Sequence, residues 1–362
     1  MQRAFASILV LFSLVIGPAA CKRDKPKLAE KHHKTRQKRH ETTEKNDTPV
    51  KSSFFAVDEI PLREALASGA IKEVKRGRGG RSLAFKITLA DGTEGYFKPE
   101  QSFSAAHWYA EVAAYYLDRE LGLGRVPPVI GRQIAWSLLK RAAGSDERLD
   151  ELTIGEDGYL KGAFVWWIPE KLTPLELGFG WERWIRIDPW SPKRVSPMRR
   201  PAVYREAIEL ERDGQDPFED LDIKIAKDPN FRERPKELSD LIVFDYLIRN
   251  VDRWGGDNTN VRTLGKGGPL LFFDNGAGFP RYAHQGGIME TRLHTVQRFR
   301  RETIDALKKF DIESFKKRLH QDPLKPVLTD YDLEGLEIRR KAILEYVSEL
   351  EEKFGQEIYT WP

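Results

Sequence analysis

Short runs rich in apolar residues, separated by Gly, Pro and polar turn residues, dominate the chain between residue 70 and about residue 168. This pattern predicts five short strands. These strands are expected at residues 71–75, 83–89, 94–98, 129–135 and 163–168. Asp91-Gly92 predicts a hairpin turn between the second and third strands. One run rich in Ala and aromatic residues, 104–121, is predicted as a helix that ends before Gly122.

Helical periodicity prevails in the second half of the chain. Residues 169–235 are rich in Pro, Trp and charge and give the weakest pattern, and no internal repeat is present. The fold class predicted is therefore α+β and bilobal, with a small β-rich lobe at 54–168 and a larger, mostly helical lobe at 169–362. Helices of the second lobe are expected at residues 201–213, 236–249, 297–319 and 331–354.

The first twenty residues have the pattern of an export signal peptide. Arg3 is followed by an apolar segment at 4–17 and by small residues directly before Cys21. This arrangement resembles the lipobox of bacterial lipoproteins, in which the Cys carries the lipid, although Pro18 departs from the usual leucine-like residue. Ordinary secretion is the alternative. Cys21 is the single Cys of the chain, so an intramolecular disulfide is excluded.

Residues 21–53 are predicted to be a lipidated Cys followed by a disordered basic tether. Residues 22–49 carry ten Lys or Arg against five Asp or Glu and almost nothing apolar, so they cannot offset their ordering entropy. The tether is more positive than the whole chain, whose net charge is +4, and the folded part is therefore slightly acidic. A basic tether favours an anionic membrane surface, and a solvated spacer is the alternative. No nucleic-acid partner is predicted.

Lys98 and Glu111 are expected to form an ion pair in the small lobe. Lys98 lies on the third predicted strand beside bulky apolar residues, where an ammonium needs an anion. Glu111 is the only charged residue in the predicted helix between residues 105 and 117, and it needs a cation in turn. The phosphates of a nucleotide would also serve Lys98. Taken singly, each residue could equally face water.

Gly77, Gly79 and Gly80 lie between the first two predicted strands, with three Arg residues beside them. Glycines allow backbone amides to approach phosphate closely, so the loop is a candidate phosphate-binding loop. A glycine-rich hairpin turn is the plainer interpretation of the same residues. No Walker A motif and no Gly-x-Ser-x-Gly elbow is present, which argues against P-loop enzymes and serine hydrolases.

Two acidic residues of the second lobe complete a pattern suited to phosphoryl transfer. Asp252 lies in a polar loop after an apolar helical run, and Asp274 ends the apolar strand 270–273. Asp252 is the candidate for orienting the hydroxyl nucleophile and Asp274 for holding a metal ion. Asn260 is the candidate amide ligand, with Asn258 as the alternative. Oxygen ligands without Cys or paired His favour Mg²⁺ or Mn²⁺ over zinc.

These motifs resemble those of the atypical secretory-pathway kinases, the Golgi casein kinase and four-jointed group. The resemblance rests on Asn250-x-Asp-Arg, on Asp274-Asn-Gly-x-Gly-Phe279, and on the Glu-bearing segment 110–119 followed by Arg125-Val-Pro-Pro. It covers residues 68 to 320 and extends more distantly to HipA-type and phosphoinositide kinases. Trp254 stands where that group often has His, and the step from Asp252 to Asn260 is longer than usual.

The resemblance implies a protein-kinase-like fold that binds ATP with Mg²⁺ or Mn²⁺. By position it implies Lys98 on the nucleotide phosphates, Glu111 holding that lysine or a metal ion, Asp252 as catalytic base and Asp274 as metal ligand. The predicted activity is transfer of the γ-phosphoryl group to a hydroxyl of a protein Ser/Thr or a glycan, by an exported, membrane-anchored envelope protein. A pseudokinase that only binds nucleotide or a partner is the first alternative, and a structural envelope lipoprotein is the second.

Overall fold

The computed structural model describes part of the chain, and residues 49–362 form one compact unit. The described residues are 53–103, 105–177, 181–188, 213, 228–255, 259–281 and 287–362. The predicted signal peptide, tether and Cys21, and all but the last residue of the predicted helix 201–213, therefore lie outside them. Within these ranges, no helix has both the length and the apolar character that a membrane span requires.

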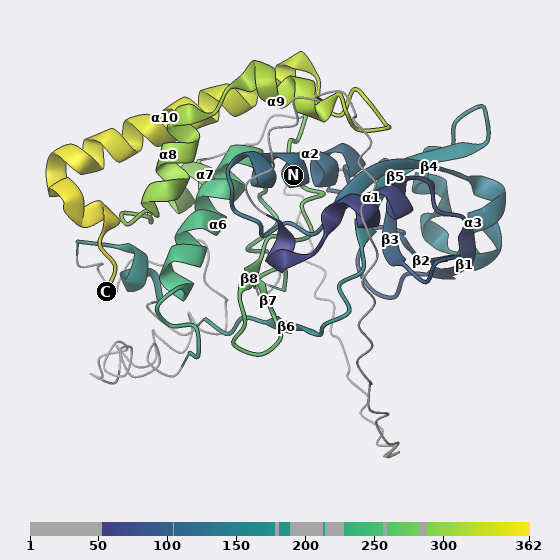
Figure 1. The fold of residues 1–362 in the computed structure, drawn as a ribbon, viewed down its shortest axis with the longest axis horizontal. Coiled ribbons are helices and arrows are strands. Elements are labelled where there is room, and N and C mark those ends of the chain that lie inside the picture. Colours follow the sequence, from purple (N-terminus) through teal and green to yellow (C-terminus); the bar gives the residue numbers. More distant parts are fainter. Residues whose placement is uncertain are drawn as a thin grey trace, which may run out of the picture. The chain divides into compact units, whose positions relative to one another are not determined.

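The β-rich part is a five-stranded antiparallel sheet in the order β1-β2-β3-β5-β4 (Figure 1). Helices α1 (Glu59–Ser68) and α3 (Trp136–Ala143) pack on the face of the sheet where alternate residues such as Phe85 and Phe97 are buried. The five predicted strands are confirmed, and the last begins earlier than expected; α1 and α3 were not predicted. The strands are β1 (Ile71–Arg76), β2 (Phe85–Leu89), β3 (Glu94–Pro99), β4 (Val129–Ala135) and β5 (Tyr159–Trp166).

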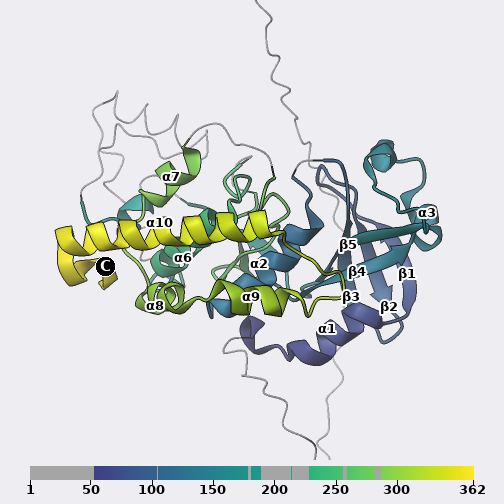
Figure 2. The same ribbon diagram turned by 90° about the horizontal axis from the view of Figure 1, so that it is seen from above.

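Helix α2 (Trp108–Glu120) connects the sheet to the helical part. It contacts β4 and β5 on one side and α6 and α9 on the other, and in both views it lies between the sheet and α6 (Figures 1 and 2). Every residue but the last is buried, which explains why apolar side chains surround the helix. The helix is shorter at its start than the predicted 104–121.

The helical part is built around α6 (Arg234–Ile248), in which every residue except Lys236 is buried. The predicted helix at 297–319 is divided in two, because the Asp311 backbone is extended and its side chain caps the second helix by accepting from the Ser314 amide at 2.8 Å. The apolar strand predicted at 270–273 is present as the shorter β8, but its pairing with β6 and β7 into a second sheet was not predicted. The remaining elements are β6 (Leu172–Pro174), β7 (Arg262–Leu264), β8 (Leu270–Leu271), α7 (Ile288–Leu293), α8 (Arg301–Lys309), α9 (Ile312–Leu319) and α10 (Asp330–Phe354).

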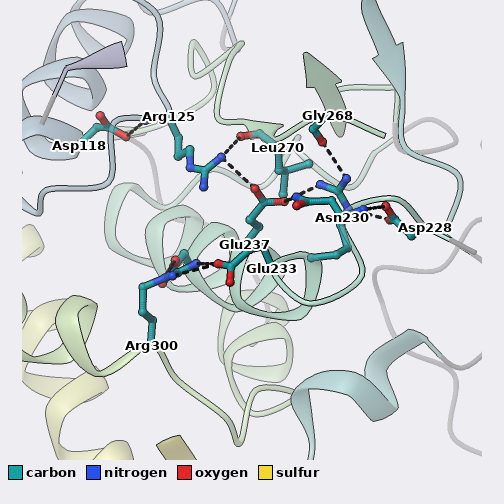
Figure 3. A network of polar contacts seen from close by, with 11 residues as sticks. Asp118, Arg125, Asp228, Asn230, Glu233, Glu237, Gly268, Leu270 and Arg300 are labelled. Atoms are coloured by element: carbon teal, nitrogen blue, oxygen red, sulfur yellow. Dashed lines mark hydrogen bonds and ion pairs between the residues drawn. The ribbon is translucent and has the colours of Figure 1, made fainter. Parts of the chain in front are cut away.

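A buried polar network joins the segment after α2 to the start of α6 (Figure 3). Arg125 pairs with Glu237 at 2.9 Å, and Glu237 also accepts from Arg234 at 2.5 Å. Arg125 in addition donates to the Leu270 carbonyl of β8 at 3.4 Å. The network therefore connects the segment after α2 to α6 and β8 of the helical part.

Candidate active site

Lys98 lies at the centre of the candidate site, on the face of β3 opposite the α1–α3 core. Residues of β3 alternate between buried and partly buried, so Lys98 points away from that core. Its Nζ lies 2.5 Å from Glu111 Oε1, and this is the ion pair that the sequence predicted. The same Nζ lies 2.7 Å from Asp274 Oδ1, so a single ammonium joins one carboxylate from each part of the molecule.

The charges of the three groups act on one another. Burial alone would lower the pKa of Lys98, but the charges of Asp274 and Glu111 outweigh it and raise the pKa above its usual value. In return, the Lys98 ammonium holds the pKa of Asp274 below its usual value, against the opposing effect of burial. Lys98 and Asp274 are therefore charged at neutral pH, and one ammonium group faces two acidic side chains.

The turn after β8 carries Asp274 and packs directly against the start of α2. Asp274 has a left-handed backbone with φ of 59°, and the Gly276 carbonyl accepts from the His107 amide at 2.8 Å. A Cβ added at Gly276 would lie 3.2 Å from the Ala105 carbonyl oxygen, closer than most real contacts. The sequence Asp-Asn-Gly is thus a turn, as its composition suggested, and the same turn places Asp274 beside Lys98.

The loop that carries Asp252 follows α6, which ends at Arg249 in a left-handed conformation. Asn250 connects this loop to the Asp274 turn, since its Oδ1 accepts from the Asp252 amide at 3.2 Å and its Nδ2 donates to the Asp274 carbonyl at 3.4 Å. The loop and the turn are therefore hydrogen-bonded neighbours, although 22 residues separate their carboxylates in the chain.

Arg253 stabilises the same junction from inside. It is fully buried, pairs with Asp245 of α6 and donates to Asn275 Oδ1 at 2.6 Å and to the Phe273 carbonyl. The Asp-Arg dipeptide is thus no local ion pair, because Arg253 turns inward and leaves Asp252 exposed. These roles of Arg253 and Asn275 were not predicted, because Arg253 contacts Asp245 and Asn275 across 8 and 22 residues of the chain.

Asp252 presents its carboxylate near the charged centre. Partial burial raises the pKa of Asp252, and the negative charge of Asp274 adds to the rise, while Arg253 and Arg292 oppose it. Asn260 Nδ2 lies 3.5 Å from Asp252 Oδ2, a long contact. Asn258, the alternative to Asn260, lies outside the described residues.

A cavity of about 1570 Å³ collects most of the predicted residues. It is large enough for a nucleotide, since small-molecule sites commonly measure about 300–1,000 Å³. Two of the loop glycines, Gly79 and Gly80, have φ above +80°, which other residues rarely adopt. The predicted residues that line the cavity are Gly77, Gly79, Gly80, Lys98, Glu111, Asn260 and Asp274, and Asp252 is joined to it through Asn260.

The donor set fits a hard divalent cation that is shared with phosphates. The described part of the chain holds no group of three His, Cys, Asp or Glu side chains that could enclose a metal ion by itself. Mg²⁺ and Mn²⁺ sites in phosphotransferases commonly use one or two carboxylates together with substrate phosphates. Glu111 and Asp274 meet this need, because both carboxylates line the cavity and reach the same ammonium.

Comparisons with known proteins were made against families, curated sequences and solved structures. Residues 192–357 match the family model described as "Golgi casein kinase, C-terminal, Fam20". The human extracellular serine/threonine protein kinase FAM20C is 25% identical over 337 residues, which cover 81% of this chain and 54% of FAM20C. Human glycosaminoglycan xylosylkinase is 24% identical over 333 residues, covering 82% of this chain and 76% of that protein. The human pseudokinase FAM20A is 24% identical over 270 residues, covering 66% of this chain and 46% of FAM20A.

Two solved structures confirm the predicted bilobal, kinase-like α+β fold. A crystal structure of the Golgi casein kinase superposes with a TM-score of 0.62 at 18% identity, covering 86% of this chain and 79% of that one. The Golgi casein kinase with Mn/ADP bound gives 0.57 at 20% identity, covering 82% and 77%. This chain spans about half the length of FAM20C. The predicted resemblance to the Golgi casein kinases is confirmed, and the chain is similar to Fam20 proteins over most of its length, whereas the more distant resemblance to HipA-type and phosphoinositide kinases stays a prediction.

Proposed function

We propose that this protein is an ATP- and metal-dependent phosphotransferase that transfers the γ-phosphoryl group to a hydroxyl. The observation that carries the proposal is the Lys98 ammonium, held between Glu111 and Asp274 at the wall of a nucleotide-sized cavity. One cation between two carboxylates leaves an excess of negative charge, which favours a divalent metal ion, and that ion would in turn bind the donor's phosphates.

In this mechanism, the glycine loop and Lys98 bind the phosphates of the donor. Glu111 positions Lys98, and Glu111, Asp274 and either Asn260 or Asn258 would hold a Mg²⁺ or Mn²⁺ ion, which would neutralise phosphate charge. The acceptor hydroxyl hydrogen-bonds to Asp252, which takes its proton. As the acceptor oxygen forms its bond to the γ-phosphorus, the bond from that phosphorus to the β–γ bridging oxygen breaks, and the nucleoside diphosphate leaves.

The acceptor is a protein Ser/Thr or a glycan, as the names of the two relatives, a serine/threonine protein kinase and a glycosaminoglycan xylosylkinase, suggest. The protein acts outside the cytoplasm, in line with the extracellular relative. The signal peptide at 1–20, lipidation of Cys21 and binding of the basic tether to an anionic membrane remain parts of the proposal that rest on the sequence. The N-lobe and C-lobe boundary near residue 168 also remains a prediction.

The test is incubation of the purified protein with γ-labelled ATP and Mg²⁺ or Mn²⁺, beside Asp252→Ala and Asp274→Ala variants. Label should pass to the protein itself or to a generic acceptor such as casein, and chelation of the metal or either substitution should abolish the transfer.

A pseudokinase is the second candidate, because FAM20A is among the relatives and because Lys98 occupies both carboxylates that a metal ion would need. A thermal-shift titration separates the two. Stabilisation by ADP with Mn²⁺ but no transfer to any acceptor supports the pseudokinase, whereas no stabilisation by any nucleotide refutes both candidates.

A further inference from the structure

Tyr96 lines the cavity, and the proposed mechanism assigns it no role. It lies on β3 two residues before Lys98, so both side chains point to the same face of the sheet. Its cross-strand neighbours are Lys86 on β2 and Val165 on β5, and all four residues line the cavity. Tyr96 is therefore part of the wall against which a bound donor would lie.

The phenol hydroxyl of Tyr96 lies directly against the first residue of the glycine loop. A Cβ added at Gly77 would stand 2.0 Å from Tyr96 Oη and 2.7 Å from Cζ, so only glycine fits there. The Gly77 amide donates to the Ala84 carbonyl at 2.7 Å, which fixes this end of the loop over the ring. The centroid of the Tyr96 ring lies 6.1 Å from the centroid of the Trp167 ring.

The same hydroxyl makes no hydrogen bond with any residue that the structure describes. Burial raises the pKa of Tyr96, opposed by Lys98 and Arg148 and supported by Asp274, so the hydroxyl keeps its proton at neutral pH. A phenol usually finds an acceptor when it is partly buried. Here the acceptor has to come from whatever fills the cavity.

We infer that Tyr96 is a further donor-binding residue, whose hydroxyl donates a hydrogen bond to the phosphate chain of the donor nucleotide beside Lys98 and under the glycine loop. The inference rests on the proposed function. Phosphate is favoured over base or ribose because the hydroxyl lies against Gly77 of the glycine loop, and because the charges of Lys98 and Asp274 both act on Tyr96.

Tyr96→Phe tests the inference, because it removes one oxygen atom and leaves the ring. Dissociation constants of the full-length protein would be measured by calorimetry with Mn²⁺-ADP and with Mn²⁺-tripolyphosphate, which has phosphates but no base or ribose. Loss of a hydrogen bond to a charged phosphate should raise both constants about tenfold. Tyr159→Phe is the matched control, since Tyr159 is exposed, lies outside the cavity lining and should leave both constants unchanged.

Three other results would overturn the inference, each in a different way. Unchanged constants in Tyr96→Phe, with wild type binding both ligands, would refute the hydrogen bond and leave the proposed function standing. Weaker binding of ADP alone would move the contact from phosphate to base or ribose. Absence of binding in the wild type would refute the proposed function itself and the inference with it.

Discussion

Two clusters of charged side chains join the sheet-bearing part to the helical part, and they differ in how completely their charges are matched. In the first, Lys98 serves both Glu111 and Asp274 at the wall of the cavity, and the Asp274 side chain is 43% exposed. In the second, Arg234 uses Nε for Asp228, Nη1 for Glu237 and Nη2 for the Gly268 carbonyl, with no part of its side chain exposed (Figure 3).

The difference distinguishes a cluster that can bind a ligand from one that stabilises the fold. Each cluster contains an ion pair between distant segments, Lys98–Asp274 in the first and Arg125–Glu237 in the second, so pairing and burial alone do not identify the functional one. The second is closed and saturated, and Arg125 brings it a further positive charge at Glu237. The first keeps one cation for two carboxylates and opens on a cavity, with a third carboxylate, Asp252, close by. An unpaired charge that faces a solvent-filled cavity favours ligand binding, whereas a paired and enclosed charge stabilises the fold.

The largest expected effect is on the turnover number, when a residue is substituted beside the first cluster, which is open to the cavity. Asp252→Asn removes the proton acceptor and should lower the turnover number roughly 100- to 10,000-fold. Because Asp252 is exposed, the free energy of unfolding should hardly change. Phosphoryl transfer and denaturant unfolding measure the two quantities, with the exposed Asp150→Asn as control. A variant that retains transfer would remove Asp252 from the mechanism.

Breaking the closed cluster should have the opposite result. Glu237→Gln leaves Arg234 and Arg125 short of their shared partner inside the protein, and should lower the free energy of unfolding by about 3–5 kcal/mol. The donor affinity of the molecules that remain folded should stay unchanged. Glu233→Gln is the control in the same network, because Glu233 is 43% exposed and should contribute less than about 1 kcal/mol. Equal losses in both variants would contradict the contrast.

The same contrast explains what the sequence could predict. Local sequence patterns identified the strands at 85–89 and 94–99, and Lys98 was recognisable as an ammonium beside bulky apolar residues. In the second sheet the apolar run 270–273 predicted β8, whereas β6 and β7, three residues long, carry no such signal. Nor does α1, in which only Leu66 is buried and Ile60 is 72% exposed.

The predicted site residues were those whose chemistry is unusual for their surroundings. Glu111 was recognisable as a lone charge in an apolar helix, and Asp274 as an acid that ends an apolar strand. Glu237 and Arg125 resemble ordinary surface charges in the sequence, and only their contact across the fold shows their role. Pairs that are far apart in the chain leave no mark in either local pattern, so the closed cluster could not be predicted.

A third network of polar contacts lies between the open and the closed cluster in how far its side chains are exposed. Glu59 of α1 accepts from the Phe54 amide at 2.5 Å, from the Tyr115 hydroxyl at 2.6 Å and from Arg119 at 2.8 Å, and so fixes the helix that carries Glu111. Glu59→Gln should lower the free energy of unfolding by about 2 kcal/mol through a weaker contact with Arg119. Hydrogen exchange of the α2 amides should increase, whereas the exposed Glu64→Gln in the same helix should change neither.

The smallest expected effect is a change in the pKa of Asp252, which directly measures the excess negative charge of the open cluster. Because burial and Asp274 raise the pKa of Asp252, its carboxyl should titrate above the ordinary value of 3.8, and transfer should fail as the pH drops through that raised pKa. Asp274 has the opposite shift, so the stability from its pair with Lys98 is present at neutral pH and is lost only below the usual carboxyl range.

Asp274→Asn should therefore lower the pKa of Asp252, since it removes the negative charge of Asp274 and leaves the desolvation of Asp252 in place. Titration of ¹³C-labelled aspartate carboxyls by NMR measures this without any need for activity, and Asp150→Asn serves as the control. Binding of Mn²⁺ at Asp274 should shift the pKa of Asp252 in the same direction, because a cation offsets the same negative charge. An Asp252 pKa that responds to neither change would mean that the two carboxylates do not share one electrostatic centre, and the distinction between the open and the closed cluster would fail.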